Sequence, residues 1–141
     1  MTASLSENHR RGISSTLGLL DEMLCRFERW AKGDVAQGVL YQEHDTLSGS
    51  QRQAILKDIA ALRRLMAELR DTLGLEIKAQ DVAGAIWSQS LAFWEALVEL
   101  EAKYLKRYGD LPEGFAKEFD PKVQRIIQHV IRIADAANRA P

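Results

Sequence analysis

Histidines are the first residues to consider for chemistry, because imidazole both transfers protons and binds metals near neutral pH. The chain has three: His9 opens the first predicted helix, His44 falls in a long connection, and His129 lies on the polar face of the last predicted helix. Metal centres in helical bundles use Glu-x-x-His pairs on facing helices, and the sequence contains none. Glu43 and Asp45 flank His44, but adjacent loop residues rarely complete a coordination shell alone. We therefore predict no metal site and no cofactor.

The segment Asn8 to Ser15 offers a second interpretation of His9. It resembles the phosphoacceptor stretch of histidine phosphotransfer bundles, and this resemblance implies phosphoryl relay from a receiver domain to the imidazole. In that family a basic residue and a glycine stand three and four positions after the histidine, whereas Arg11 and Gly12 come one position earlier here. A one-residue slip turns side chains by about 100° around a helix. His9 is therefore a weak phosphoacceptor candidate, and a partly exposed first-turn residue is the favoured interpretation.

Nucleophilic or acid catalysis has no clear motif in this sequence. Cys25 is the single cysteine, so the chain has no internal disulfide, no thiolate zinc cluster and no CxxC pair; we expect it to be a small buried residue. Glu101 lies in line with apolar positions, where it is either a buried acid or a residue at the rim of a bundle. Four serines fall in predicted helices rather than at strained turns: Ser14, Ser15, Ser88 and Ser90. We predict no catalytic residues and no enzymatic activity.

The overall composition is that of an ordinary globular protein. The 141 residues are 46% hydrophobic and 28% charged, and 19 Lys and Arg balance 20 Asp and Glu. This balance gives no electrostatic surplus for nucleic acid. No stretch approaches the roughly 20 apolar residues that a membrane span needs, and the segment Met1 to Gly12 has no apolar core of a signal peptide. We expect a cytoplasmic protein that binds neither nucleic acid nor membrane.

Four stretches have apolar residues at alternating steps of three and four, as amphipathic helices do. They run from Ser6 or Asn8 to Lys32, and over residues 51–73, 81–108 and 121–138. Short connections after the second and third stretches favour antiparallel neighbours. The sequence therefore predicts an all-α single domain, residues 1–141, folded as an antiparallel up-down-up-down four-helix bundle with a long first connection.

Capping residues suggest where these helices begin and end. The second helix is predicted to start at Ser50 with Gln53, or alternatively at Ser48 with Gln51, and to end before Gly74. The fourth helix is predicted to start at Asp120 with Pro121.

The first connection, residues 34–49, is long for a helical bundle. Asp34 is in position to cap a short extra helix that would pass through Val35, Val39 and Leu40. The connection serves either as a lid over a site or only as a linker.

The strongest functional feature is an apolar stripe on the third predicted helix. It contains Trp87, Leu91, Trp94, Val98 and Tyr108, beside a second apolar row on the same helix. Large aromatic residues are enriched at the energetic centres of interfaces. We therefore expect this stripe to be an interface or a ligand groove, unless both tryptophans simply fill the core.

These features favour a non-enzymatic helical module that works by protein contact, self-associates through this stripe, and serves as an adaptor or regulatory subunit. Two alternatives stay open. One is a sensor or carrier that holds a small molecule inside the bundle, lidded by residues 34–49. The other is phosphorelay through His9. The partner, the oligomeric state and the biological process are not specified by any motif.

Overall fold

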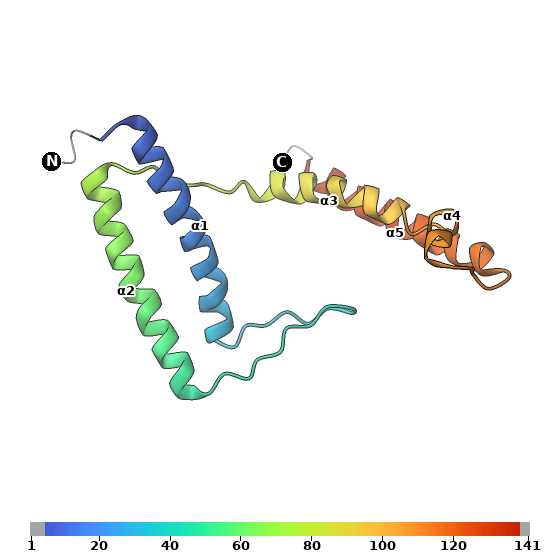
Figure 1. Cartoon of the computed structure of the whole chain (residues 1–141), viewed down its shortest axis with the longest axis horizontal. Helices are drawn as coiled ribbons and strands as arrows, with labels where there is room; N and C mark the ends of the chain where they lie inside the picture. Colours follow the sequence, from blue (N-terminus) through green and yellow to red (C-terminus); the bar gives the residue numbers. More distant parts are fainter. Residues whose placement is uncertain (1–4, 139–141) are drawn as a thin grey trace. The chain divides into compact units, whose positions relative to one another are not determined.

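The structure, a computed structural model, describes residues 5–138, and its named elements are all helices (Figure 1). They are α1 (Glu7–Ala31), α2 (Gly49–Leu73), α3 (Val82–Val98), α4 (Ala102–Leu105), the 3-10 helix η2 (Lys106–Tyr108) and α5 (Phe115–Ala137). The predicted all-α class is confirmed. Compact packing divides the chain after Lys78 into two units, each described by itself. In the described part of the chain, no helix has the length and hydropathy to cross a bilayer.

The two helices of the first unit begin at capping boxes. The Ser6 hydroxyl accepts a hydrogen bond from the His9 backbone N–H at 3.1 Å, and the Ser6 N–H donates to the His9 Nδ1 at 3.3 Å. Ser48 and Gln51 form the same reciprocal pair at the start of α2, so the Ser48 alternative is correct and the Ser50 start is wrong. Gly74 ends α2 in the left-handed conformation (φ 65°), as predicted.

α1 and α2 form an antiparallel hairpin (Figure 1). Their interface buries three small or medium apolar side chains: Leu24, Ala31 and Ile59. At its edge the Arg63 guanidinium donates to the Glu28 carboxylate at 2.8 Å, and this hydrogen bond lowers the pKa of Glu28. Apolar burial and the ion pairs of Arg63 with Glu28 and Asp21 therefore hold the hairpin together.

The connection from α1 to α2 contains an extended arm, residues 34–47, and not the short helix that we predicted (Figure 1). Gln37 and Gln42 form an isolated antiparallel bridge, and the Gly38 N–H donates to the Tyr41 carbonyl at 2.7 Å. A Cβ on Gly38 would lie 2.9 Å from that carbonyl oxygen, so glycine permits this tight turn. The arm is thus a minimal β-hairpin, because its backbone groups pair across the arm rather than along a helix.

In the second unit, α3 and α5 pack as an antiparallel pair (Figure 1). The centre of the pair is a cluster of buried residues, Leu97, Val123 and Ile127, with three partly buried neighbours around it: Val98, Phe119 and Val130. Ala134 extends the buried side of α5 toward its C-terminus. The residues of α5 among them, Phe119, Val123, Ile127, Val130 and Ala134, fall at steps of three and four, so an amphipathic face of the predicted last helix packs on α3.

The predicted third helix, residues 81–108, is not continuous. α3 ends at Val98, Glu101 is extended (ψ 147°), and α4 begins at Ala102. The break depends on a tertiary contact, because the Ala102 N–H donates to the Asp120 carboxylate on α5 at 2.9 Å and the Ala102 side chain is buried. Such a contact outweighs the helical propensity of the segment and leaves no trace in the local sequence.

The predicted start of the last helix at Asp120 and Pro121 is also wrong. α5 begins six residues earlier, at Phe115, after Gly114 in the left-handed conformation (φ 79°). The Phe115 and Phe119 rings stack at 4.7 Å, and this packing supports the helical turn that precedes the proline. Asp120 caps α4 instead of its own helix.

The structure therefore gives two antiparallel helical pairs, α1 with α2 and α3 with α5. The up-down-up-down bundle of four helices and the single domain stay predictions.

Candidate interaction surfaces

The predicted stripe on α3 divides into a packed part and an exposed part. Val98 packs against the α3–α5 core cluster, and Leu91 is half-buried. Trp87 and Trp94 keep 40% and 44% of their surface exposed. Tryptophan is well buried on average, so two half-exposed indoles two turns apart leave a substantial aromatic surface on this helix.

Tyr108 does not continue this stripe. It lies in η2, beyond the break after Val98, and is exposed, with the Arg107 guanidinium 4.9 Å from its ring centroid. Two further apolar residues of α3 lie outside the predicted stripe and are exposed: Phe93, which is more exposed than either tryptophan, and Ile86. Both belong to the second apolar row of α3, which also contains Leu97. Packing against α5 covers Leu97 and Val98 and leaves exposed residues in both rows.

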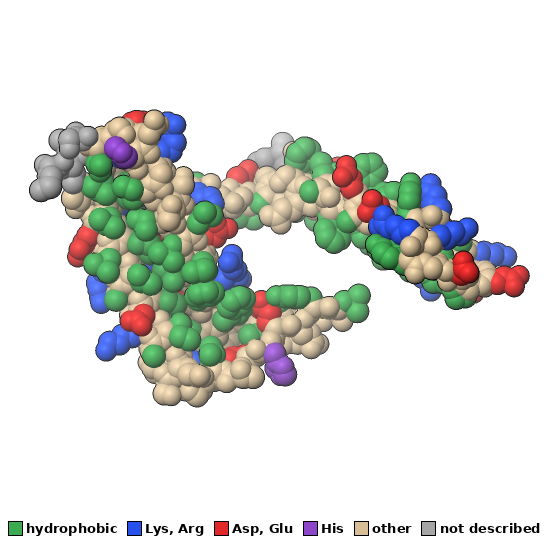
Figure 2. Space-filling view, in the orientation of Figure 1, with side chains coloured by type: hydrophobic (Ala, Val, Ile, Leu, Met, Phe, Trp, Pro, Cys, Tyr) green, Lys and Arg blue, Asp and Glu red, His purple; other side chains and the backbone are tan. Residues whose placement is uncertain are grey.

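The α1–α2 hairpin has an apolar face of its own. Hydrophobic side chains gather over the pair of helices in Figure 2. Leu19 on α1 is 59% exposed and Leu65 on α2 is 56% exposed, with Leu62 and Leu69 exposed beside Leu65. We call these four leucines the hairpin face. A two-helix hairpin buries only one side of each helix, so an amphipathic sequence leaves such a face.

The arm is ordered by the carboxylate of Glu43. Its Oε1 accepts hydrogen bonds from the Trp30 indole N–H at 2.9 Å and from the Ala36 N–H at 2.8 Å, while its Oε2 accepts from the Tyr41 hydroxyl at 2.8 Å. The Ala36 hydrogen bond, followed by those of Trp30 and Tyr41, lowers the pKa of Glu43. The hydrogen bond between the Tyr41 hydroxyl and Glu43 raises the pKa of Tyr41. Glu43 therefore joins the arm to α1 through the Trp30 indole and braces the arm internally through Ala36 and Tyr41.

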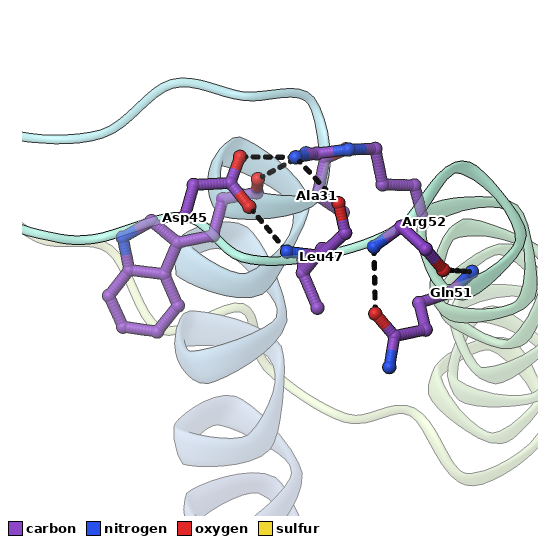
Figure 3. Close-up of polar contacts among 7 residues, drawn as sticks. Ala31, Asp45, Leu47, Gln51 and Arg52 are labelled. Carbon is purple, nitrogen blue, oxygen red and sulfur yellow. Dashed lines mark hydrogen bonds and ion pairs between the residues drawn. The ribbon is translucent and has the colours of Figure 1, made fainter.

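The base of the arm is fixed by Arg52 of α2 (Figure 3). Its guanidinium donates to the Trp30 and Ala31 carbonyls at 3.2 and 3.1 Å, to the Leu47 carbonyl at 3.3 Å, and to the carboxylate of Asp45. The Arg52 contact, with help from the Leu47 N–H, lowers the pKa of Asp45. One side chain thus ties the end of α1, the arm and α2 together.

The tip of the arm is apolar and uncovered. Val39 is 97% exposed, Leu40 is 100% exposed, and Tyr41 is also exposed. Fully exposed aliphatic residues are common one at a time, but here they are adjacent and stand on a turn held by hydrogen bonds at both ends. The tip is consequently a preformed apolar projection.

The hydrogen bonds of Glu43 predict how the arm responds to acid. Because the folded-state pKa of Glu43 lies below the ordinary value of 4.5, its stabilisation is complete above that value and is lost as pH falls through the folded-state pKa. We expect the Trp30 indole N–H resonance to hold its position from about pH 7 to about pH 5 and to shift on further acidification. A ¹H–¹⁵N NMR titration measures this, with the Trp87 and Trp94 resonances as references.

Glu43→Gln is the control for this titration, because it removes the ionisable group and keeps the side-chain length. The variant should show no acid shift at Trp30. A shift that persists in Glu43→Gln would assign the transition to another carboxylate, with Asp45 the nearest in sequence.

An open groove of about 810 Å³ lies at the other end of the hairpin. The start of α1 and the end of α2 line it together with residues 76–78, and its lining mixes Arg10, Arg11 and Lys78 with Glu7, Asp71 and Glu76. Arg10 is already engaged, since its Nε donates to the Leu73 carbonyl at 3.2 Å. The groove has balanced charge and is lined by no arm residue, so the arm does not act as its lid.

The weak phosphoacceptor candidate, His9, is exposed near this groove. Its Nδ1 lies 3.0 Å from the Ser6 hydroxyl and belongs to the capping box of α1. The capping role explains the position of the His9 ring. Ser14 and Ser15 line the groove. Phosphorelay stays a prediction.

The other residues considered for chemistry lie apart. Cys25 is exposed, so the expectation of a buried residue is wrong; one position after the buried Leu24, it lies at the edge of the helix interface, where the Arg63 guanidinium donates to its Sγ at 3.8 Å. Glu101 lies at the break after α3, and the Gln124 amide donates to it at 3.1 Å. His44 and His129 are exposed. Within residues 5–138, no three His, Cys, Asp or Glu side chains form a group that could hold a metal ion.

Comparison of the chain with protein-family models, with curated proteins and with solved structures gave no match. The exposed apolar surfaces of the two units are therefore the features on which a function can be argued.

Proposed function

We propose that the chain is a non-enzymatic helical module that works by protein contact and self-associates through the exposed indoles of α3. The observation that carries this proposal is the pair Trp87 and Trp94, each with about two fifths of its surface exposed. Indoles in this state gain apolar burial and retain an N–H donor when a partner covers them. The expected role is that of an adaptor or regulatory subunit in the cytoplasm.

A charge at the centre of the stripe tests the proposal. Trp94→Glu should lower the molecular mass measured by sedimentation equilibrium toward the 15.9 kDa of a single chain. Burial of an unpaired carboxylate at an interface is strongly unfavourable. Gln89→Glu is the matched control: it adds the same charge to an exposed polar position of α3 and should keep the wild-type mass.

Trp94 also contributes to its own unit, so folding is checked by far-UV circular dichroism, and Trp87→Glu serves as a second variant. Wild-type mass in both tryptophan variants, with helical content preserved, would contradict self-association through α3. The ligand-carrier alternative stays a prediction.

A further inference from the structure

The arm has a property that the stability of its own unit does not explain. Five hydrogen bonds of Glu43 and Arg52 involve the arm, yet the side chains of Val39 and Leu40 are almost wholly exposed. Ordering a loop costs conformational entropy, and apolar side chains that stay exposed to water do not stabilise the subunit. A preformed projection lowers the entropic cost of binding, because the bound conformation exists beforehand.

The same unit carries an uncovered surface that suits this tip. The hairpin face exposes Leu19, Leu62, Leu65 and Leu69. The arm cannot cover the face of its own hairpin in this conformation, because it extends away from the two helices (Figure 1) and the Val39 and Leu40 side chains at its tip are almost wholly exposed. A second copy of the chain supplies a face for each arm.

We propose that two copies of the chain exchange arms, so that the tip of each (Val39, Leu40 and Tyr41) packs on the hairpin face of the other. This arrangement is isologous: residue i of one copy contacts residue j of its partner, and the reverse contact follows from the two-fold axis. It covers the tip and the face in both copies at once. Seven large apolar side chains per copy are enough to form the centre of an interface of roughly 800 Å² per partner.

The charges determine which edge of the hairpin face receives the arm. The arm has three carboxylates, Asp34, Glu43 and Asp45, and no Lys or Arg. On α2 the leucines are flanked by Asp58 and Glu68, which repel an acidic segment. On α1, by contrast, Arg26 follows Leu19 by seven residues, which places it on the same side of the helix.

Arg26 is exposed and makes no ion pair within residues 5–138. The arm therefore approaches over the α1 edge, with its tip at Leu19.

The arm exchange rests on the proposed function only in that the chain associates with itself, and it uses a different surface. Sedimentation equilibrium on four proteins separates the two contacts: wild type, Trp94→Glu, Leu40→Asp and the double variant. Because Leu40 contacts nothing in its own unit, Leu40→Asp leaves the fold intact. We expect a lower mass for each single variant than for wild type, and a monomer for the double variant.

A double variant with the same mass as Trp94→Glu would overturn the arm exchange and leave the α3 contact untouched. A Trp94→Glu variant of wild-type mass would instead contradict the α3 contact alone.

Disulfide trapping tests the location of the arm. Protein with Leu40→Cys and Cys25→Ser is mixed, under mild oxidation, with protein carrying Leu19→Cys and Cys25→Ser. The natural Cys25 provides the control: it is exposed on the same helix, but six residues from Leu19 and therefore on another side. Cys at position 40 should form a covalent dimer with position 19 at least tenfold faster than with Cys25 of the wild-type chain. Equal rates, or dimers that join only position 40 to position 40, would overturn the proposal.

Discussion

Ile127→Ala should lower the free energy of unfolding by about 2–4 kcal/mol, which is among the larger effects that a single substitution can have in this chain. Ile127 is 5% exposed and packs with Leu97 and Val123 at the centre of the α3–α5 pair. Truncation to alanine removes three carbons from this cluster and leaves a cavity, since two rigid helices close on it only in part. Urea unfolding followed by far-UV circular dichroism measures the change.

Ile133→Ala is the matched control. It removes the same atoms from the same helix, but Ile133 is 54% exposed, so we expect a loss of about 0.5 kcal/mol or less. Equal effects of the two substitutions would mean that α5 does not pack on α3 through the face that contains Ile127.

Arg52→Met should have the second large effect, about 2 kcal/mol, because it removes three hydrogen bonds to backbone carbonyls at the end of α1 and at the base of the arm. Methionine keeps the length of the aliphatic stem, so the loss reports on the guanidinium. Arg52→Lys should recover only part of it, since one ammonium cannot reach acceptors spread over two segments. The same denaturation experiment measures both.

Arg64→Met is the control for this series. Arg64 lies on the same helix, is exposed and makes no hydrogen bond or ion pair to another side chain within the described residues, so its replacement should change stability by about 0.5 kcal/mol or less. If Arg52→Met behaved in the same way, the guanidinium would not hold the arm.

Local sequence was sufficient to predict the helices of the first unit. The periodic leucines of α1 and α2 predict their extent, and Ser48, Gln51 and Gly74 determine where α2 begins and ends. Capping is a local interaction between residues three or four apart, so a single sequence contains all the information. The choice between Ser48 and Ser50 stayed open because both fit the same spacing.

The errors in the second unit have a common cause, which is contact between residues far apart in the chain. The break after Val98 depends on the Asp120 carboxylate, which accepts a hydrogen bond from the Ala102 N–H, 18 residues earlier in the chain. The early start of α5 depends on the local stacking of Phe115 on Phe119 and, beyond that pair, on the packing of Phe119 on the α3–α5 core. Neither long-range contact has a local signature, and the proline rule alone placed the helix start at Pro121.

The arm was missed for a related reason. Its hairpin depends on Glu43, whose partners include Trp30, 13 residues earlier. Asp34 looked like a helix cap before Val35, Val39 and Leu40, but Val39 and Leu40 are almost wholly exposed, so no packing supports a helix there. The interface candidates were only half predictable, because the sequence identified the tryptophans but not the arm tip or the hairpin face.

The hydrogen bond from Trp30 to Glu43 has a practical consequence. The indole belongs to α1, yet its N–H is held by a carboxylate from the arm, so the electronic surroundings of this ring change whenever the arm shifts. With Trp87 and Trp94 replaced by phenylalanine, the emission spectrum of the remaining indole becomes a built-in optical reporter of arm movement. Binding of a partner at the tip would then be detected as a shift in the emission spectrum of the unlabelled protein.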